Sequence, residues 1–104
     1  MTVPRKRFPD CPIERTIAVL SGRWKARILW QLLDSPRRYS ELRERLAGVT
    51  ERALSQALSE LRADGVVDKF ESVWRVTSLG DSLQSALQDM YRWGSAHSSA
   101  LPHR

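Results

Sequence analysis

The sequence predicts a mainly α-helical domain with one small β-hairpin in its second half. Apolar residues recur at helical spacing along most of the 104 residues. This spacing changes once, over residues 66–76, where valine, phenylalanine and tryptophan gather as they do in strands. A chain of this length is expected to form a single domain, residues 1–104.

A basic arm is expected over residues 1–10, before the first helix. Pro12 suits the first turn of a helix that runs to about Leu20, since that turn leaves its amide hydrogens unpaired in any case. Ser21-Gly22 is expected to end this helix. Its apolar residues recur at i, i+4 and i+7 and are Ile13, Ile17 and Leu20.

Two further helices are expected before Gly48. The first runs from about Trp24 to Asp34 and ends before a proline, which disfavours helical backbone in the preceding residue. The second is short, covers residues 40–47, begins with Ser40 as N-cap and ends next to Gly48. The apolar face of the longer helix consists of Ile28, Leu29, Leu32 and Leu33.

A fourth helix is expected over residues 50–64. Thr50 is a suitable N-cap, and Glu51 is favourably placed at the positive end of the helix dipole. Apolar side chains on one side of this helix are expected to point inward. They are Leu54, Ala57, Leu58 and Leu61.

The remainder of the chain is predicted to form the hairpin and one long helix. Two short strands are expected within residues 66–76, joined by a tight turn near Glu71-Ser72. The last helix is expected over residues 78–98, followed by a tail over residues 99–104. Its apolar residues step by four, four and three and are Leu79, Leu83, Leu87 and Met90.

This order of elements is that of a helix-turn-helix followed by a wing. Residues 40–47 and 50–64 form the two helices, and the hairpin forms the wing of a core that spans residues 11–77. In this motif the second helix lies in the major groove of DNA. Its outward face is predicted to consist of Arg52, Gln56, Ser59 and Ala63, flanked by Ser55 and Ala53. Thr50 at the start of the helix is a further candidate for a DNA contact.

The residue types on this outward face suit the reading of base edges. Arginine binds guanine through two hydrogen bonds, glutamine binds adenine, and serine suits either. A solvated helix face would carry the same residue types, so the order of the elements is the stronger argument. Arg38 opens the helix-turn-helix and is expected to contact phosphate, with a solvated loop residue as the alternative.

The positive charge is concentrated at the N-terminal end. The net charge is +5, and residues 1–27 alone carry seven basic and two acidic side chains. A basic end on a neutral body suggests a polyanionic partner, here double-stranded DNA. Most of the basic residues are arginine, which matches phosphate and guanine, although genome composition explains this bias equally well.

The chain resembles a known family in a series of short motifs. The motifs are Cys11-Pro12-Ile13-Glu14-Arg15-Thr16-Ile17, Ser21-Gly22-Arg23-Trp24-Lys25, Arg38-Tyr39-Ser40-Glu41-Leu42-Arg43, Gly48-Val49-Thr50-Glu51-Arg52, Asp64-Gly65-Val66-Val67 and Val76-Thr77-Ser78-Leu79-Gly80. On these motifs it resembles the HxlR-type regulators, a bacterial and archaeal winged-helix group related to MarR. The resemblance covers roughly residues 11–94.

The resemblance implies a homodimeric transcription factor that binds an inverted repeat. A cytoplasmic location is expected separately, because the N-terminus lacks an apolar signal region and the sequence has one cysteine. It also implies dimerisation through the N-terminal segment and the last helix, with Leu83, Leu87, Met90 and Trp93 as the candidate seam. The sequence departs from the family in two respects. Relatives carry a longer wing, which argues against a minor-groove contact here. Relatives also often have a basic residue where this chain has Ser59, which predicts poorer phosphate contact.

Cys11 is the one candidate for redox chemistry. Its position at a helix start near basic residues favours the thiolate, while Asp10 and Glu14 oppose it. The resemblance implies a thiol that senses oxidants or electrophiles, so a small-molecule effector or an oxidant is an expected partner. The alternative is an inert thiol that is shielded by Ile17 or the last helix.

Other functions find no support in the sequence. No glycine-rich phosphate loop, nucleophile elbow or metalloprotease motif occurs, so neither an enzyme nor a cofactor is expected. A single cysteine, with His97 and His103 near a frayed end, does not predict a metal site. The four tryptophans are expected in core or dimer packing, and no apolar run predicts a membrane span. A winged helix that binds only protein is the alternative function.

Overall fold

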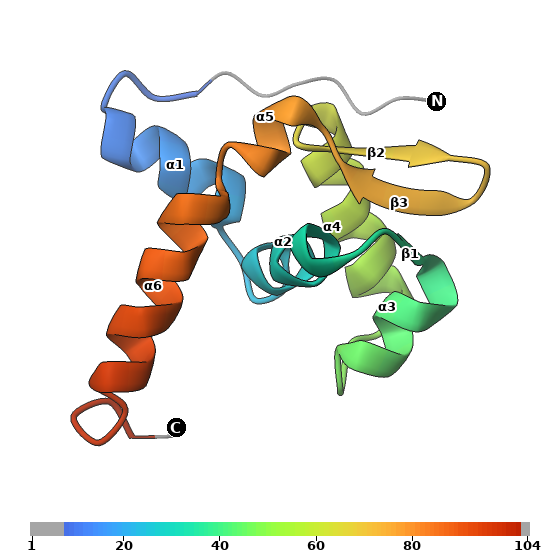
Figure 1. Cartoon of the computed structure of the whole chain (residues 1–104). Coiled ribbons are helices and arrows are strands. Elements are labelled where there is room, and N and C mark those ends of the chain that lie inside the picture. Colours follow the sequence, from blue (N-terminus) through green and yellow to red (C-terminus); the bar gives the residue numbers. More distant parts are fainter. Residues whose placement is uncertain (1–7, 103–104) are drawn as a thin grey trace.

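The structure is a computed structural model that describes residues 8–102. It contains the predicted helix-turn-helix and wing, with α1 and α6 at one end of the molecule and the hairpin at the other (Figure 1). The basic arm lies mostly outside the described residues, as does His103. The elements in chain order are α1 Pro12–Leu20, α2 Lys25–Asp34, β1 Arg37–Arg38, α3 Tyr39–Arg45, α4 Glu51–Ala63, β2 Val67–Phe70, β3 Val73–Val76, α5 Ser78–Asp81 and α6 Gln84–Ala96.

One hydrophobic core joins α2, α3, α4 and the sheet. The apolar faces predicted for α2 and α4 supply most of it, which confirms the helical periodicity read from the sequence. Gly48 ends the turn between α3 and α4 with a φ of +87°, a left-handed conformation that suits glycine. The largest side chains without exposed surface are Ile28, Leu29, Leu42, Leu46, Leu54, Leu58, Leu61 and Val67.

The sheet has three antiparallel strands where the sequence predicted two. β3 lies in the middle, with β2 on one side and the two-residue strand β1 on the other, so that Arg37 pairs with Trp74 and Arg38 with Val73. Arg37 is 5% exposed and is held by Asp34 (Nη2–Oδ2, 2.8 Å) and by the carbonyl oxygen of Gln31 (3.3 Å). β1 therefore anchors the segment between α2 and α3 to the wing.

The wing turn lies where the sequence placed it. Glu71 and Ser72 have φ angles of +48° and +68°, as in the two-residue turns that match the twist of a hairpin. The register pairs Phe70 with Val73 and Val67 with Val76. The wing is therefore a compact hairpin.

The predicted single C-terminal helix is wrong, because the structure breaks it into α5 and α6 at Ser82-Leu83. The Ser82 hydroxyl donates to the carbonyl oxygen of Leu79 (2.5 Å), which is the acceptor that the amide of Leu83 would use in a continuous helix. That amide bonds to the carbonyl of Gly80 instead (3.0 Å). The apolar spacing continues through the break, so periodicity alone did not reveal it.

Candidate nucleic-acid interface

The second helix of the helix-turn-helix, α4, is divided cleanly between core and solvent. Thr50 caps it, because its side-chain oxygen accepts a hydrogen bond from the amide of Ala53 (3.0 Å). The face predicted to point inward is buried, so it fixes how the helix lies on the body. The side chains predicted to face DNA are exposed, namely Arg52, Ser55, Gln56 and Ser59.

Tyr39 ties the two helices of the motif together at their starts. Its hydroxyl donates to the carbonyl oxygen of Glu51 (3.1 Å) and lies 3.3 Å from the hydroxyl oxygen of Ser55. Ser55 is therefore partly occupied within the protein, which suits a supporting contact better than a primary one. Nothing in the sequence spacing of Tyr39 predicts this hydrogen bond, because its partner Glu51 lies 12 residues further along the chain.

Arg38 lies at the junction between the wing and α3. Its side chain is exposed, and its amide donates to Glu41 Oε1 (2.9 Å) at the start of the helix. Arg38, rather than Ser40, occupies the N-cap position, because the helix begins at Tyr39. This correction leaves Arg38 at the exposed start of the motif, where a phosphate contact was expected.

The wing adds two cations that the sequence analysis did not single out. Lys69 Nζ lies 5.5 Å from the ring centre of Trp74, and the guanidinium of Arg75 lies 5.1 Å from that of Phe70. Both are exposed, and such contacts hold a cation over an aromatic ring. Alternation along strands β2 and β3 could have placed these residues on the wing surface, but not over these rings.

Cys11 is exposed at the N-cap position of α1. The alternative of a thiol shielded by Ile17 or by the last helix is therefore wrong for the single subunit, in which Ile17 is itself exposed. The carbonyl of Cys11 accepts the amide of Arg15 (2.9 Å), which holds the thiol at the start of the helix. The thiol is open to a reagent or to a second protein.

The four candidate seam residues fall into two groups. Leu87 is 4% exposed and belongs to the core of the subunit, and Leu83 packs against that core. Met90 and Trp93 lie further along α6 and are 51% and 60% exposed. Assigning Leu87 to an exposed seam was therefore wrong, because the helical face that carries it turns into the body.

Apolar side chains of α1 and α6 border a shared groove. The groove has a volume of about 500 Å³ and is lined by Ile13, Ile17 and Leu20 of α1 and by Met90 of α6. Ile13 and Ile17 are more than half exposed, which is unusual for isoleucine. An apolar surface formed by two helices indicates an interaction site.

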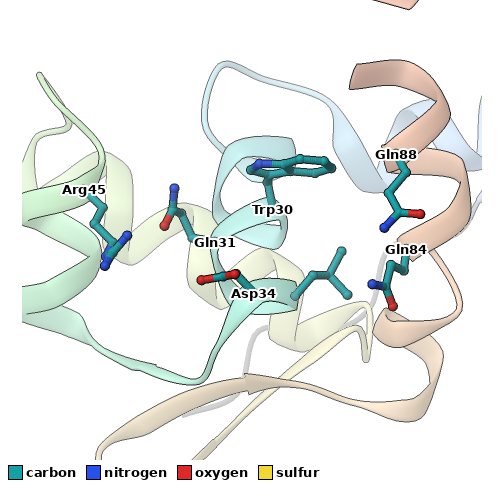
Figure 2. Close-up of a pocket in the computed structure, with 7 residues that line it drawn as sticks. Trp30, Gln31, Asp34, Arg45, Gln84 and Gln88 are labelled. Carbon is teal, nitrogen blue, oxygen red and sulfur yellow. The ribbon is translucent and has the colours of Figure 1, made fainter. Parts of the chain in front are cut away.

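A second hollow lies between α2, α3 and α6. Figure 2 shows Trp30, Gln31 and Asp34 on α2 between Arg45 of α3 on one side and Gln84 and Gln88 of α6 on the other. The hollow has a volume of about 320 Å³. Trp30 stacks on Tyr91 with the ring centres 4.9 Å apart, so this tryptophan joins α2 to α6 on the surface instead of filling the core.

The described residues offer no metal centre and no membrane span. Within residues 8–102, no three His, Cys, Asp or Glu side chains come together as a metal site would require. None of the helices that the structure describes is long and apolar enough to cross a bilayer.

Comparison with known proteins identifies the family. The model of the HxlR-like helix-turn-helix family matches residues 19–101, which is most of the chain. The chain belongs to the HxlR-like family. It is 36% identical over 96 residues to the HTH-type transcriptional regulator YkvN of Bacillus subtilis, covering 86% of this chain and 80% of that protein.

Solved structures of other regulators share the fold. The redox regulator HypR in its reduced form matches with a TM-score of 0.82 and 28% identity, covering 88% of this chain and 97% of that one. Quinone-bound YodB from B. subtilis matches with a TM-score of 0.76 and 29% identity, covering 83% of this chain and 99% of that one. HypR is also known in an oxidised form, with a TM-score of 0.78 to this HxlR-like chain.

Proposed function

We propose that this HxlR-like chain is a DNA-binding transcriptional regulator that acts as a homodimer on an inverted repeat. The observation that carries the proposal is that α4 has one buried face and one exposed face. The buried face packs in the core, and Arg52 and Gln56 are exposed near the capped start of the helix. The start of the second helix is the part of a helix-turn-helix that meets base edges. A DNA-binding regulator of this kind works in the cytoplasm.

The contacts are assigned by position and chemistry. Arg52 and Gln56 read bases, with Ser55 in support and Thr50 and Ser59 at the edges of the contact. Arg38 holds phosphate from the start of the motif, and Lys69 and Arg75 give the wing phosphate contacts of the same kind. The Arg5-Lys6-Arg7 segment, which lies outside the described residues, is expected to add to the phosphate contacts.

The homodimer is supported by the exposed apolar surface of α1 and α6. Ile13, Ile17, Met90 and Trp93 are each more than half exposed in the single subunit. A second copy that covers this surface removes it from water, and two-fold symmetry presents the same patch from both subunits. The two copies of α4 are then expected about one DNA turn apart, roughly 34 Å.

Regulation by an oxidant or an electrophile is supported by the exposed thiol of Cys11. HypR is described as a redox regulator, and YodB is known with a quinone bound. Cys11 lies at the start of α1, next to the surface that we assign to the dimer. A group added to this thiol, or a disulfide between two subunits, would change how the subunits pack.

Selection of DNA from a random pool, followed by titration, tests the proposal. Arg52→Ala should lower affinity for the selected site by about 5- to 150-fold, since a two-bond contact to guanine contributes about 1–3 kcal/mol, and should relax the preference at one position. Arg92→Ala is the control, because it removes the same charge from the exposed side of α6, where Arg92 forms an ion pair with Asp89 (3.0 Å).

The outcome separates the candidate functions. If Arg52→Ala binds selected and random DNA in an unchanged ratio, the assignment of base reading to α4 is wrong. If the pool yields no preferred sequence with the parent protein, the winged helix does not act as a specific regulator, and the protein-binding alternative takes its place.

A further inference from the structure

Three helices meet at the ammonium group of Lys25. This residue begins α2 and is 6% exposed, an unusual degree of burial for lysine. Its Nζ lies 3.3 Å from Glu60 Oε2 of α4 and donates to the carbonyl oxygen of Ala18 in α1, also at 3.3 Å. One cation therefore links the N-terminal helix to the helix that we expect to read DNA.

The position of Lys25 is unfavourable without these two partners. The first turn of a helix carries a partial positive charge, so a cation there is repelled by the dipole of its own helix. Burial also removes the water that would solvate the ammonium. Glu60 supplies a full negative charge, and Ala18 lies near the C-terminal end of α1, where the dipole is negative. Both contacts therefore stabilise the ammonium at this position.

Among the described residues, α1 packs against the core mainly through its last turn. None of its nine residues is buried, and Ile13 and Ile17 face solvent in the subunit. Val19 and Leu20 pack against the core only at its last turn. The contact from Lys25 to Ala18 holds the same turn, reinforced by the hydroxyl of Ser21, which donates to the same carbonyl (3.1 Å).

We propose that Lys25 is a positioning residue that sets the angle of α1 against α4, and so sets the spacing of half-sites that the dimer accepts. The inference rests on the proposed homodimer, in which α1 contributes to the seam and α4 to the DNA contact. Each base pair added between half-sites moves them by about 3.4 Å and rotates them by about 35°. A dimer with a fixed angle accepts one spacing, and a dimer with a loose angle accepts several.

The experiment measures affinity for a set of DNA duplexes with the selected half-sites at five successive spacings. Lys25→Met keeps an apolar stem and removes the charge, while Lys25→Arg keeps a cation at this position. Lys69→Met is the matched control, since it makes the same chemical change on the exposed wing. Exchange of amide hydrogens in α1 is measured for each variant without DNA.

The parent protein should prefer one spacing over its neighbours by roughly tenfold or more. Lys25→Met should flatten that preference to about threefold and speed amide exchange in α1 by about tenfold, while exchange at Leu58 and Leu61 in the core of α4 stays unchanged. Lys25→Arg should restore the preference. Lys69→Met should weaken all five duplexes alike, as the loss of a phosphate contact does.

Two results would overturn the inference. One leaves the proposed DNA-binding homodimer intact, and the other overturns the homodimer as well. If the parent prefers one spacing and Lys25→Met prefers it equally sharply, the role of Lys25 is wrong and the regulator proposal stands. If the parent shows no spacing preference, the homodimer on an inverted repeat is wrong, and the inference fails with it. Should Lys25→Met not fold, Glu60→Gln carries the same expectation, because the side chain of Glu60 is 25% exposed and tolerates the change.

Discussion

Gly80 occupies a site where no other residue fits. It is buried at the start of the C-terminal region, and a Cβ built on it would overlap the carbonyl oxygen of Val66. The amide of Thr77 donates to that oxygen (3.1 Å), and the Thr77 hydroxyl donates to the carbonyl of Gly65 (2.6 Å) while accepting from the amide of Gly80 (3.1 Å). The backbone after α4 and the start of α5 are therefore locked together at this glycine.

Gly80→Ala should destabilise the protein by about 3 kcal/mol or more, because the methyl group meets backbone that is held by these hydrogen bonds. Gly94→Ala is the control, since the space around Gly94 in α6 is open and alanine favours a helix interior by about 0.5–1 kcal/mol. Urea unfolding followed by circular dichroism measures both. Equal stability of the two variants would show that the contact at Val66 relaxes at little cost.

At the scale of residues, chemistry local in sequence was predictable and contacts across the fold were not. Thr50 was identified as a cap because the capping bond spans only three residues. The partners of Tyr39 and Lys25 lie on other helices, and no periodicity marks them. Ser40 has the right chemistry for a cap, but the pairing of β1 with β3 starts the helix at Tyr39.

At the scale of elements, the helices with a long apolar period were predicted well. α1, α2 and α4 begin and end within a residue or two of their predicted limits. β1 was missed because a strand of two residues is too short to show an alternating pattern of apolar side chains. It is a strand because its backbone pairs with the edge of β3. The break between α5 and α6 was missed because apolar spacing runs through it, while the break lies in the backbone, where the amide of Leu83 bonds to the carbonyl of Gly80.

Met90 is exposed and Leu87 is buried on α6, so an aspartate substitution at each position is expected to have a different effect. Met90→Asp should give a folded monomer. Met90 is 51% exposed in the single subunit, so the carboxylate introduced by the substitution is unfavourable only where a second copy would cover it. Leu87→Asp should unfold the subunit, since Leu87 is 4% exposed and a charge there lacks a partner. Light scattering measures the first effect and thermal unfolding the second. A parent protein that is already a monomer of about 12 kDa would contradict the assignment of α1 and α6 to a dimer seam.

At the scale of the whole molecule, the dimer geometry connects the thiol to the DNA contact. Cys11 begins α1, and α1 borders the groove that also contains Met90. If the two copies of Cys11 lie within about 4.4–6.8 Å between Cα atoms, oxidation can join them. If they lie further apart, an electrophile can still add bulk at the seam. Either change would shift the two α4 helices relative to fixed half-sites.

Diamide should therefore weaken binding of the parent protein to its selected site and leave Cys11→Ser unaffected. The reagent removes two electrons and two protons from a pair of thiols, so the product is a disulfide-linked dimer that a reductant reverses. DNA titration of both proteins, with and without diamide, measures the effect, and mass spectrometry follows the thiol. Equal binding in all four samples, with the thiol unreacted by mass spectrometry, would assign Cys11 a structural role and leave the effector unidentified.

The short hairpin of β2 and β3, with its turn between Phe70 and Val73, also limits how a wing of this type can change in length. Side chains alternate between the two faces of a strand, so lengthening each strand by one residue would move every residue beyond the insertion to the opposite face. Lengthening each strand by two residues would keep Trp74 facing the core and would extend the tip by about 7 Å. Descendants of this sequence that acquire a longer wing are therefore expected to gain residues four at a time or to replace the turn itself, and a single inserted residue would be selected against unless a bulge absorbs it.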